Sequence, residues 1–145
     1  MMGKTLNKKQ ISILLDIKGK LLMLDKLLYS KNVNRCDSEK KIKKSDWFFK
    51  EHLTKSPNMP GILITESMLQ SSICLLKKDK KNKNLIYLIT KKNVNFYNEI
   101  KKFNGNLNIE TKIVSKKIGL YQVISKCFFK KKRIASGNFF FVKKN

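Results

Sequence analysis

Residues 61–76 constrain the fold of this chain more than any other segment of its sequence. Their apolar side chains occupy most of the circumference of a helix, and a helix that is apolar on nearly all sides is buried on nearly all sides. The two prolines of the chain, Pro57 and Pro60, lie just before this segment, and proline is tolerated in the first turn of a helix. The sequence therefore predicts one buried helix over about residues 60–76. It is too short to cross a bilayer, which takes ~20 apolar residues.

The segments that follow this helix change to the shorter period of β-strands. Residues 107–116 alternate apolar and polar side chains, and further strands are predicted over residues 85–90, 119–129 and 134–142. We expect these four strands to form an antiparallel meander that covers the helix. A buried helix and a strand meander together predict an α+β layout in a single domain over residues 1–145.

The remaining segments have weaker patterns. Residues 10–16 have enough apolar positions for a short helix or a turn against the core, and residues 21–29 are short and apolar enough for a strand. Residues 32–45 are mostly polar and are interpreted as a solvent-facing strand with a loop. A turn rich in Lys and Asn is expected over residues 77–84.

The net charge of +23 is the usual first indication of a nucleic-acid or membrane partner. The excess is nearly all lysine, spread through the chain, and the only arginines are Arg35 and Arg133. Because arginine is the preferred reader of guanine and phosphate, a nucleic-acid-binding module is the weakest alternative. A compositional bias toward lysine explains the charge, and the same field would attract an acidic protein.

Three cysteines at wide spacing, Cys36, Cys74 and Cys127, form no paired motif, and a single histidine accompanies them. Neither a zinc site nor a disulfide framework is predicted, and a reducing cytoplasm is the expected location. The apolar pieces of residues 1–24 are short and broken by charges, so neither a secretory signal nor a membrane span is expected.

Two side chains near the predicted helix carry most of the chemical interest. His52, the only histidine, has the side chain best suited to proton transfer near neutral pH. Glu66 is a single acid inside the apolar segment, where it is costly to bury without a purpose or a partner. Each has an ordinary alternative. His52 could be a surface or capping residue, and Glu66 could be a snorkelling or paired core acid.

Residues 48–70, FFKEHLTKSPNMPGILITESMLQ, resemble the active-site segment of the hotdog-fold beta-hydroxyacyl-acyl-carrier-protein dehydratases of bacterial type II fatty-acid synthesis. In that family the pattern FFxGHFPxxPxMPGxLxxExxxQ carries the catalytic His and Glu. Residues 21–27 look like the family's FLLVDRV strand, and residues 87–96 resemble the strand after the central helix. The matched positions of the active-site pattern are Phe48, Phe49, His52, Pro57, Met59, Pro60, Gly61, Leu63, Glu66 and Gln70.

The chain departs from the family pattern beside the matched residues. Glu51 replaces the glycine before His52, and Leu53-Thr54 replace the Phe-Pro after it. Residues 17–20 stand where the family has HRYP, and residues 101–105 occupy the region of its PGD. We expect these changes to affect the pocket more than the fold, since loops can be rewritten on an unchanged scaffold.

The resemblance implies a hotdog fold, in which a long antiparallel sheet wraps around one buried helix. It implies dehydration, reversible as hydration, of beta-hydroxyacyl thioesters on acyl-carrier protein in fatty-acid or related acyl-chain biosynthesis. His52 would be the base and Glu66 the acid, facing each other across the interface of a homodimer or of a trimer of dimers. No metal or redox cofactor and no nucleic-acid or membrane partner is expected, and the acidic carrier would dock on the basic surface.

Further residues of the motif are expected to bind substrate. Gly61, at a helix N-terminus, would donate its N–H to the thioester oxygen. Gln70, one turn beyond Glu66, would hold its carboxyl or a water. The residues expected to line an acyl tunnel are Phe49, Met59, Ile62 and Leu63. A hotdog thioesterase and a nonenzymatic acyl-binding relative remain open as alternatives.

Overall fold

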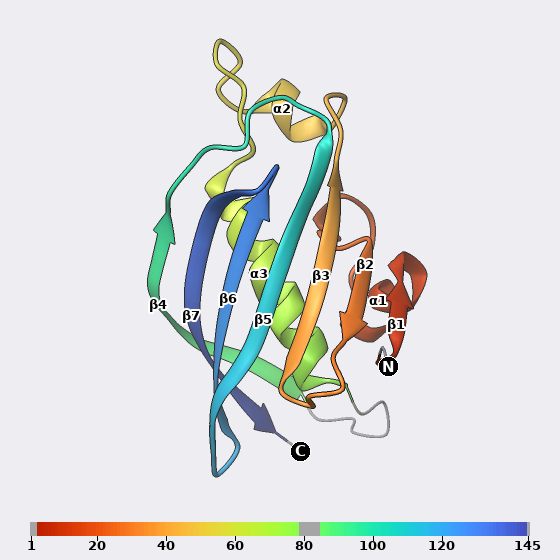
Figure 1. Cartoon of the computed structure of the whole chain (residues 1–145), viewed down its shortest axis with the longest axis vertical. Helices are drawn as coiled ribbons and strands as arrows, with labels where there is room; N and C mark the ends of the chain where they lie inside the picture. The colour runs from red at the N-terminus through yellow and green to blue at the C-terminus, as the bar shows by residue number, and fades with distance from the viewer. Residues whose placement is uncertain (1–2, 79–84, 145) are drawn as a thin grey trace.

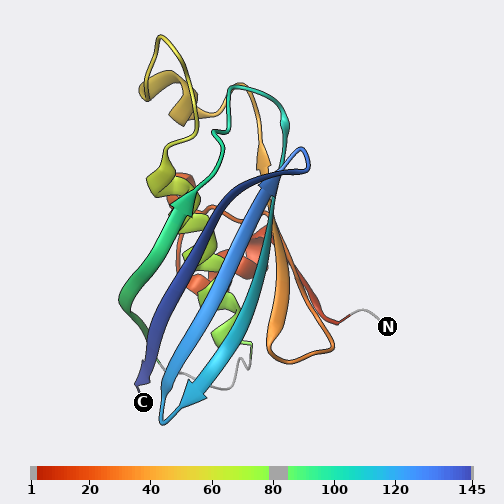
Figure 2. The same ribbon diagram turned by 60° about the vertical axis from the view of Figure 1, so that its left-hand side comes forward.

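The computed structural model describes residues 3–78 and 85–144, folded as one seven-stranded sheet around a single long helix, α3 (Gly61–Leu76). Every neighbouring pair of strands is antiparallel. The sheet curves so that α3 lies along its concave face, as the two views in Figures 1 and 2 show. This is the predicted hotdog arrangement.

The strand order across the sheet is β1-β2-β3-β5-β6-β7-β4. The strands are β1 (Thr5–Asn7), β2 (Lys26–Tyr29), β3 (Arg35–Ile42), β4 (Leu85–Phe96), β5 (Gly105–Lys117), β6 (Leu120–Phe129) and β7 (Lys132–Lys144). The shorter helical pieces are α1 (Lys8–Leu15), a 3-10 turn (Gly19–Leu21) and α2 (Trp47–Glu51).

Helix α3 begins directly after Pro60, whose carbonyl oxygen accepts hydrogen bonds from the N–H groups of Leu63 at 3.0 Å and Ile64 at 3.2 Å. Most of its residues are buried, and Met68 is fully enclosed. The predicted buried helix over residues 60–76 is therefore confirmed.

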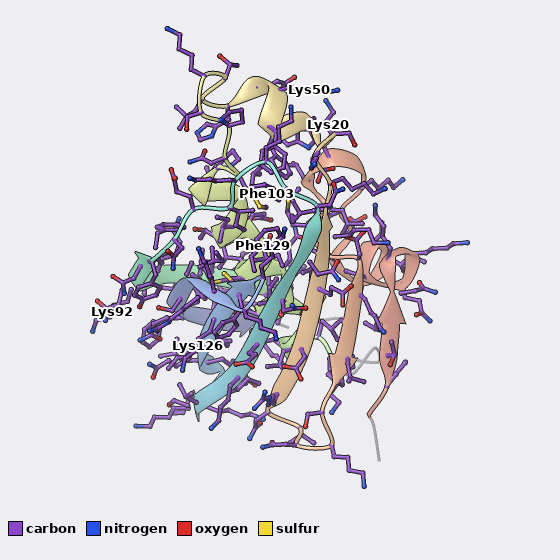
Figure 3. The ribbon with its side chains drawn as sticks, turned by 45° about the horizontal axis from the view of Figure 1, so that its top comes forward. Lys20, Lys50, Lys92, Phe103, Lys126 and Phe129 are labelled. Atoms are coloured by element: carbon purple, nitrogen blue, oxygen red, sulfur yellow. The ribbon has the colours of Figure 1, made fainter. Side chains whose placement is uncertain are left out.

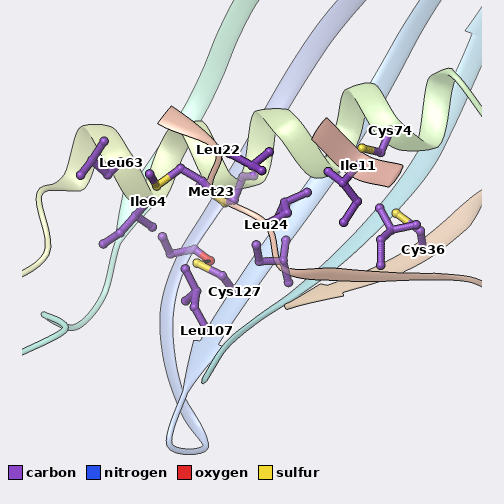
Figure 4. Close-up of a cluster of buried hydrophobic side chains, with 14 of the residues drawn as sticks. Ile11, Leu22, Met23, Leu24, Cys36, Leu63, Ile64, Cys74, Leu107 and Cys127 are labelled. Atoms are coloured by element: carbon purple, nitrogen blue, oxygen red, sulfur yellow. Dashed lines mark hydrogen bonds between the residues drawn. The ribbon is translucent and has the colours of Figure 1, made fainter. Parts of the chain in front are cut away.

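The core fills the space between α3, the sheet and the N-terminal segment. Figure 4 shows that side chains from residues far apart in the sequence meet there. They include Ile11, Leu22, Met23, Leu24, Cys36, Leu63, Ile64, Cys74, Leu107 and Cys127.

A row of buried hydroxyl groups crosses this core. Ser71 of α3 bonds Ser38 of β3 and lies 2.8 Å from the hydroxyl oxygen of Thr111 in β5. Thr111 in turn lies 3.0 Å from Ser125 in β6. Because a buried polar group left without a partner is costly, this row fixes how α3 is rotated against the sheet.

Two predicted strands in the first half have different roles from those expected. Only β2 of residues 21–29 pairs as a strand, because the N–H of Met23 donates to the side chain of Gln70 on α3 instead of to a neighbouring strand. The polar segment 32–45 does contain a strand, β3, but it lies inside the sheet between β2 and β5. Cys36 and Ile42 are fully buried there.

The predicted four-strand meander was wrong in one connection. Strands β5, β6 and β7 are consecutive neighbours, whereas β4 pairs with β7 at the far edge. Residues 97–104 carry the chain from β4 across to β5, which pairs with β3. Helix α1 confirms the expected short helix, α2 was not predicted, and residues 79–84 of the expected Lys- and Asn-rich turn lie outside the described residues.

Replacing Met68 by alanine should lower the free energy of unfolding by about 2–5 kcal/mol, because it leaves a cavity beneath the sheet. The measurement is denaturant unfolding at one fixed protein concentration. Ile13→Ala, on the exposed side of α1, is the control and should change stability by less than about 0.5 kcal/mol. Equal effects of the two substitutions would contradict the central position of α3.

The three cysteines should resist thiol reagents while the protein is folded. Burial raises the pKa of Cys36 and of Cys127 to about 12 and raises the pKa of Cys74 as well. Because the thiolate is the reactive form, we expect no modification of the native protein at pH 8 and modification of all three thiols in denaturant. Colorimetric thiol titration measures this, and fast reaction of the native protein would show that a cysteine is accessible.

Candidate active site

His52 follows the short helix α2, which is anchored by the buried rings of Phe48 and Phe49, with centroids 4.6 Å apart. The Nδ1 atom of the half-buried His52 lies 3.3 Å from the carbonyl oxygen of Asn58. A carbonyl oxygen can only accept, so Nδ1 carries the proton in this contact. In the neutral form of the ring this tautomer leaves the lone pair on Nε2, as a base requires.

The loop between His52 and α3 is held in place by the segment that follows β4. The side-chain amide of Asn58 donates to Glu99 Oε1 at 2.9 Å, and the Met59 N–H donates to the Ile100 carbonyl oxygen at 2.8 Å. Leu53, the residue after His52, has a φ of 49°, which non-glycine residues rarely adopt. The orientation of His52 thus depends on contacts that are distant in sequence.

Glu66 lies in the second turn of α3 and is half-buried in the single chain. Its Oε1 accepts a hydrogen bond of 3.0 Å from Gln70 Nε2, so the expected contact between these residues is present. Because Oε1 is occupied as an acceptor, the second oxygen, Oε2, is the one available to carry and deliver a proton.

Gln70 is fully buried, and three hydrogen bonds fix its amide. Its Oε1 accepts from the Met23 N–H at 2.8 Å, while its Nε2 donates to the Leu21 carbonyl oxygen as well as to Glu66. The backbone of residues 21–23 therefore decides which end of the amide faces Glu66. No sequence pattern indicated these backbone partners.

Gly61 lies at the first position of α3 and opens onto a cavity of about 270 Å³. A side chain at this position would meet the ring of Phe96 at 3.2 Å, so glycine lets β4 approach the start of the helix. The cavity is lined by Asn58, Met59, Gly61, Ile64, Phe96, Tyr97, Asn98 and Glu99.

The residues expected to line an acyl tunnel divide into two groups. Phe49, Met59 and Leu63 are buried and belong to the core cluster, whereas the side chain of Ile62 is 78% exposed and points out of the chain. Among the described residues, no hydrogen bond joins His52 to Glu66. Asn58 and Phe96 also lie at the candidate site, beside His52 and Gly61 respectively. The sequence did not single them out, because an asparagine or a phenylalanine at these positions has no distinctive pattern.

No cluster of three His, Cys, Asp or Glu side chains that could hold a metal occurs within residues 3–78 and 85–144. Over the same residues, no helix is long and apolar enough to cross a membrane. The lysines are distributed over the surface, as Lys20, Lys50, Lys92 and Lys126 on four separate elements illustrate (Figure 3).

Solved structures with the same fold include dehydratases and thioesterases. The dehydratase heterocomplex ApeI:P from Xenorhabdus doucetiae aligns with a TM-score of 0.73 at 12% identity, over 93% of this chain and 91% of that chain. Zebra fish thioesterase superfamily member 2 aligns with a TM-score of 0.67 at 14% identity, over 95% of both chains. At these identities the likeness concerns the fold alone.

The relatives found by sequence comparison include dehydratases of one named type. The 3-hydroxyacyl-[acyl-carrier-protein] dehydratase FabZ of Geobacillus sp. (strain WCH70) is 26% identical over 113 residues, 77% of each chain. The FabZ of Geotalea uraniireducens (strain Rf4) is 29% identical over 111 residues, 74% of this chain and 75% of the relative. The family model of the FabA-like domain matches residues 17–138, which include the whole motif around His52 and Glu66. The protein therefore belongs to the FabA-like family.

Proposed function

We propose that this protein catalyses the reversible dehydration of 3-hydroxyacyl thioesters carried on acyl-carrier protein, in fatty-acid or related acyl-chain biosynthesis. The observation that carries the proposal is the orientation of the two motif residues. His52 has Nε2 free because Nδ1 faces a carbonyl oxygen, and Glu66 has Oε2 free because Gln70 occupies Oε1. A base and an acid are the two groups that this elimination needs.

The reaction removes a proton next to the thioester carbonyl and expels the beta-hydroxyl group as water. His52 Nε2 takes the proton, and the electrons of the broken C–H bond form the new carbon–carbon double bond. Glu66 Oε2 gives its proton to the leaving hydroxyl. The N–H of Gly61, at the positive end of the α3 dipole, stabilises the charge that develops on the thioester oxygen.

A second copy of the chain would complete the site. Strand β4 is the last strand of the sheet, and its apolar side chains are mostly exposed, among them Leu85, Tyr87, Leu88 and Ile89. An exposed apolar edge strand is a template for pairing with another strand. We propose a homodimer formed through β4, in which His52 of one subunit works with Glu66 of its partner, and in which Ile62 is covered. Dimers of this kind could assemble further into a trimer of dimers.

Acyl-carrier protein is the proposed partner because carriers of this type are acidic and this surface is basic. The buried free thiols agree with the reducing cytoplasm, where we place the enzyme.

His52→Ala and Glu66→Gln should each lower kcat by about 10²-fold or more, since each removes a proton-transfer group. The measurement is formation of the enoyl thioester from a 3-hydroxyacyl carrier substrate. Glu51→Gln, an exposed acid beside His52, is the control and should retain nearly full activity. Full activity in both site variants would refute the assigned roles.

The same assay separates the alternatives. Release of the free carrier thiol without enoyl product would identify a thioesterase. Saturable acyl binding without either product would identify a nonenzymatic acyl-binding protein.

Mixing the two inactive variants tests whether each site is shared between subunits. If His52 and Glu66 come from different chains, subunit exchange between the variants creates one intact site in each mixed dimer. Random exchange should then restore about a quarter of the unmodified activity, because half of the dimers are mixed and each has one working site. Failure to regain activity, with exchange verified by a mass-tagged subunit, would place the complete site within one chain.

A further inference from the structure

We propose that Glu99 is a positioning residue for the base His52, acting through Asn58 and deciding which nitrogen of the imidazole ring carries the proton. Glu99 lies in residues 97–104, called here the strap, which cross from β4 to β5 at the same end of the molecule as α2 (Figure 1). The inference rests on the proposed function, because it gives the base of that reaction a further residue on which it depends.

One peptide group links His52 to the strap. The peptide between Asn58 and Met59 donates its N–H to the carbonyl oxygen of Ile100 at 2.8 Å, and its own carbonyl oxygen lies 3.3 Å from Nδ1 of His52. This peptide is trans and planar, so its N–H and C=O point in opposite directions. Because the N–H is held against the strap, the C=O points away from the strap, toward the imidazole ring.

The side chain of Glu99 holds Asn58 from a second direction. Glu99 Oε1 accepts a hydrogen bond of 2.9 Å from Asn58 Nδ2, and Asn58 also pairs with Lys101 as an isolated antiparallel bridge. Pro57 and Pro60 lie on either side of the Asn58-Met59 pair and limit the backbone angles of the loop. The carbonyl group that faces His52 is therefore fixed at both its backbone and its side chain.

Glu99 makes this contact in place of an ion pair. The chain has 33 Lys and Arg residues against 10 Asp and Glu, and two lysines follow Glu99 closely in the strap. Within residues 3–78 and 85–144, the acids that form ion pairs are Asp25, Asp37 and Glu110. A hydrogen bond to an ionised carboxylate is stronger than one between neutral groups, so the contact with Asn58 is a firm one.

Packing does not explain an asparagine at position 58. In the described part of the chain, Asn58 Oδ1 is the one buried side-chain oxygen or nitrogen without a hydrogen-bond partner in the chain. Such an unpartnered acceptor destabilises the fold, and an apolar side chain of similar size would avoid that cost. The hydrogen bond to Glu99 does explain the asparagine, because the carboxylate needs a donor at this position.

The tautomer of His52 is the property that these contacts control. While the carbonyl oxygen of Asn58 lies beside Nδ1, the proton stays on Nδ1 and the lone pair stays on Nε2. If that oxygen turns away, the neutral ring can carry its proton on Nε2, where it then cannot accept a proton from substrate. Loss of Glu99 should therefore lower the fraction of the ring that can act as the base.

Direct contact with substrate is the alternative role, because Asn58 and Glu99 also line the cavity beside Gly61. The two roles have different kinetic consequences. A lost substrate contact raises KM and leaves the tautomer unchanged, whereas a lost positioning contact lowers kcat, changes KM little and alters the tautomer.

The first test measures the tautomer by heteronuclear NMR of the imidazole nitrogens, which report on His52 alone because it is the only histidine. At about pH 9, where an imidazole ring is neutral, the unmodified protein should carry the proton on Nδ1. Glu99→Ala should show a mixture of tautomers, and Glu99→Gln, whose amide oxygen can still accept from Asn58, should restore the Nδ1 form. A ring that keeps its proton on Nδ1 in Glu99→Ala would overturn the proposal.

Asn58→Leu separates positioning from folding. This substitution removes the unpartnered oxygen, so the variant should unfold at the same or a higher denaturant concentration than the unmodified protein. It also removes the donor to Glu99, and it should therefore show the same mixture of tautomers as Glu99→Ala. An unchanged tautomer in this stably folded variant would contradict the role of Asn58.

The second test is kinetic. Glu99→Ala should lower kcat for formation of the enoyl product by about 10-fold with KM changed by less than about 3-fold, and Glu99→Gln should recover most of this loss. The double variant Asn58→Leu/Glu99→Ala should be no slower than either single variant, because both act through one hydrogen bond. Glu110→Ala removes the same charge from the outer surface of β5 and is the control, which should keep the unmodified rate.

A raised KM with unchanged kcat and tautomer in Glu99→Ala would identify a substrate contact and overturn the positioning role. The tautomer measurement needs no turnover, so it separates this inference from the reaction itself. If the tautomer changes and no dehydration is detected, the positioning role stands and the proposed reaction fails. If dehydration is detected and Glu99→Ala leaves both tautomer and kcat unchanged, the positioning role fails alone.

Discussion

The burial of α3 under the curved sheet is the constraint on which the rest of the structure depends. This helix carries Gly61, Glu66 and Gln70, so its rotation against the sheet decides where each of them points. Apolar packing alone allows small rotations, because a helix apolar on nearly all sides has no single preferred face. The hydroxyl row through Ser71 removes that freedom, since any rotation would leave buried hydroxyl groups without partners.

The candidate acid and base are both oriented by groups outside their own elements. The backbone at residues 21–23 fixes the amide of Gln70, which fixes Glu66. The segment after β4 fixes Asn58, whose carbonyl oxygen fixes the tautomer of His52. Beside His52 the residues Glu51, Leu53 and Thr54 depart from the family motif, and the contacts that orient the ring come from Asn58 and the segment after β4.

The same sheet gives the molecule two different ends. At one end the start of α3, the cavity beside Gly61 and the loop after His52 lie together. At the other end lies the exposed β5–β6 turn. Strand β4 runs from one end to the other with an open edge, so antiparallel pairing between two copies would join unlike ends.

The sequence by itself determined the buried helix, the three long strands after residue 105, and the motif that carries His52 and Glu66. These signals are local, because apolar periodicity and proline positions act over a few turns or strand repeats. Only the tertiary structure decided three other features. Strand β4 lies at the far edge of the sheet, β3 lies in its interior, and residues 22–24 of the predicted strand 21–29 do not pair as a strand. Strand order and hydrogen-bond partners join residues that are distant in the chain. A polar strand such as β3 becomes internal only because β5 pairs with it and α3 packs against it. The supports of His52 and Glu66 belong to this second group for the same reason.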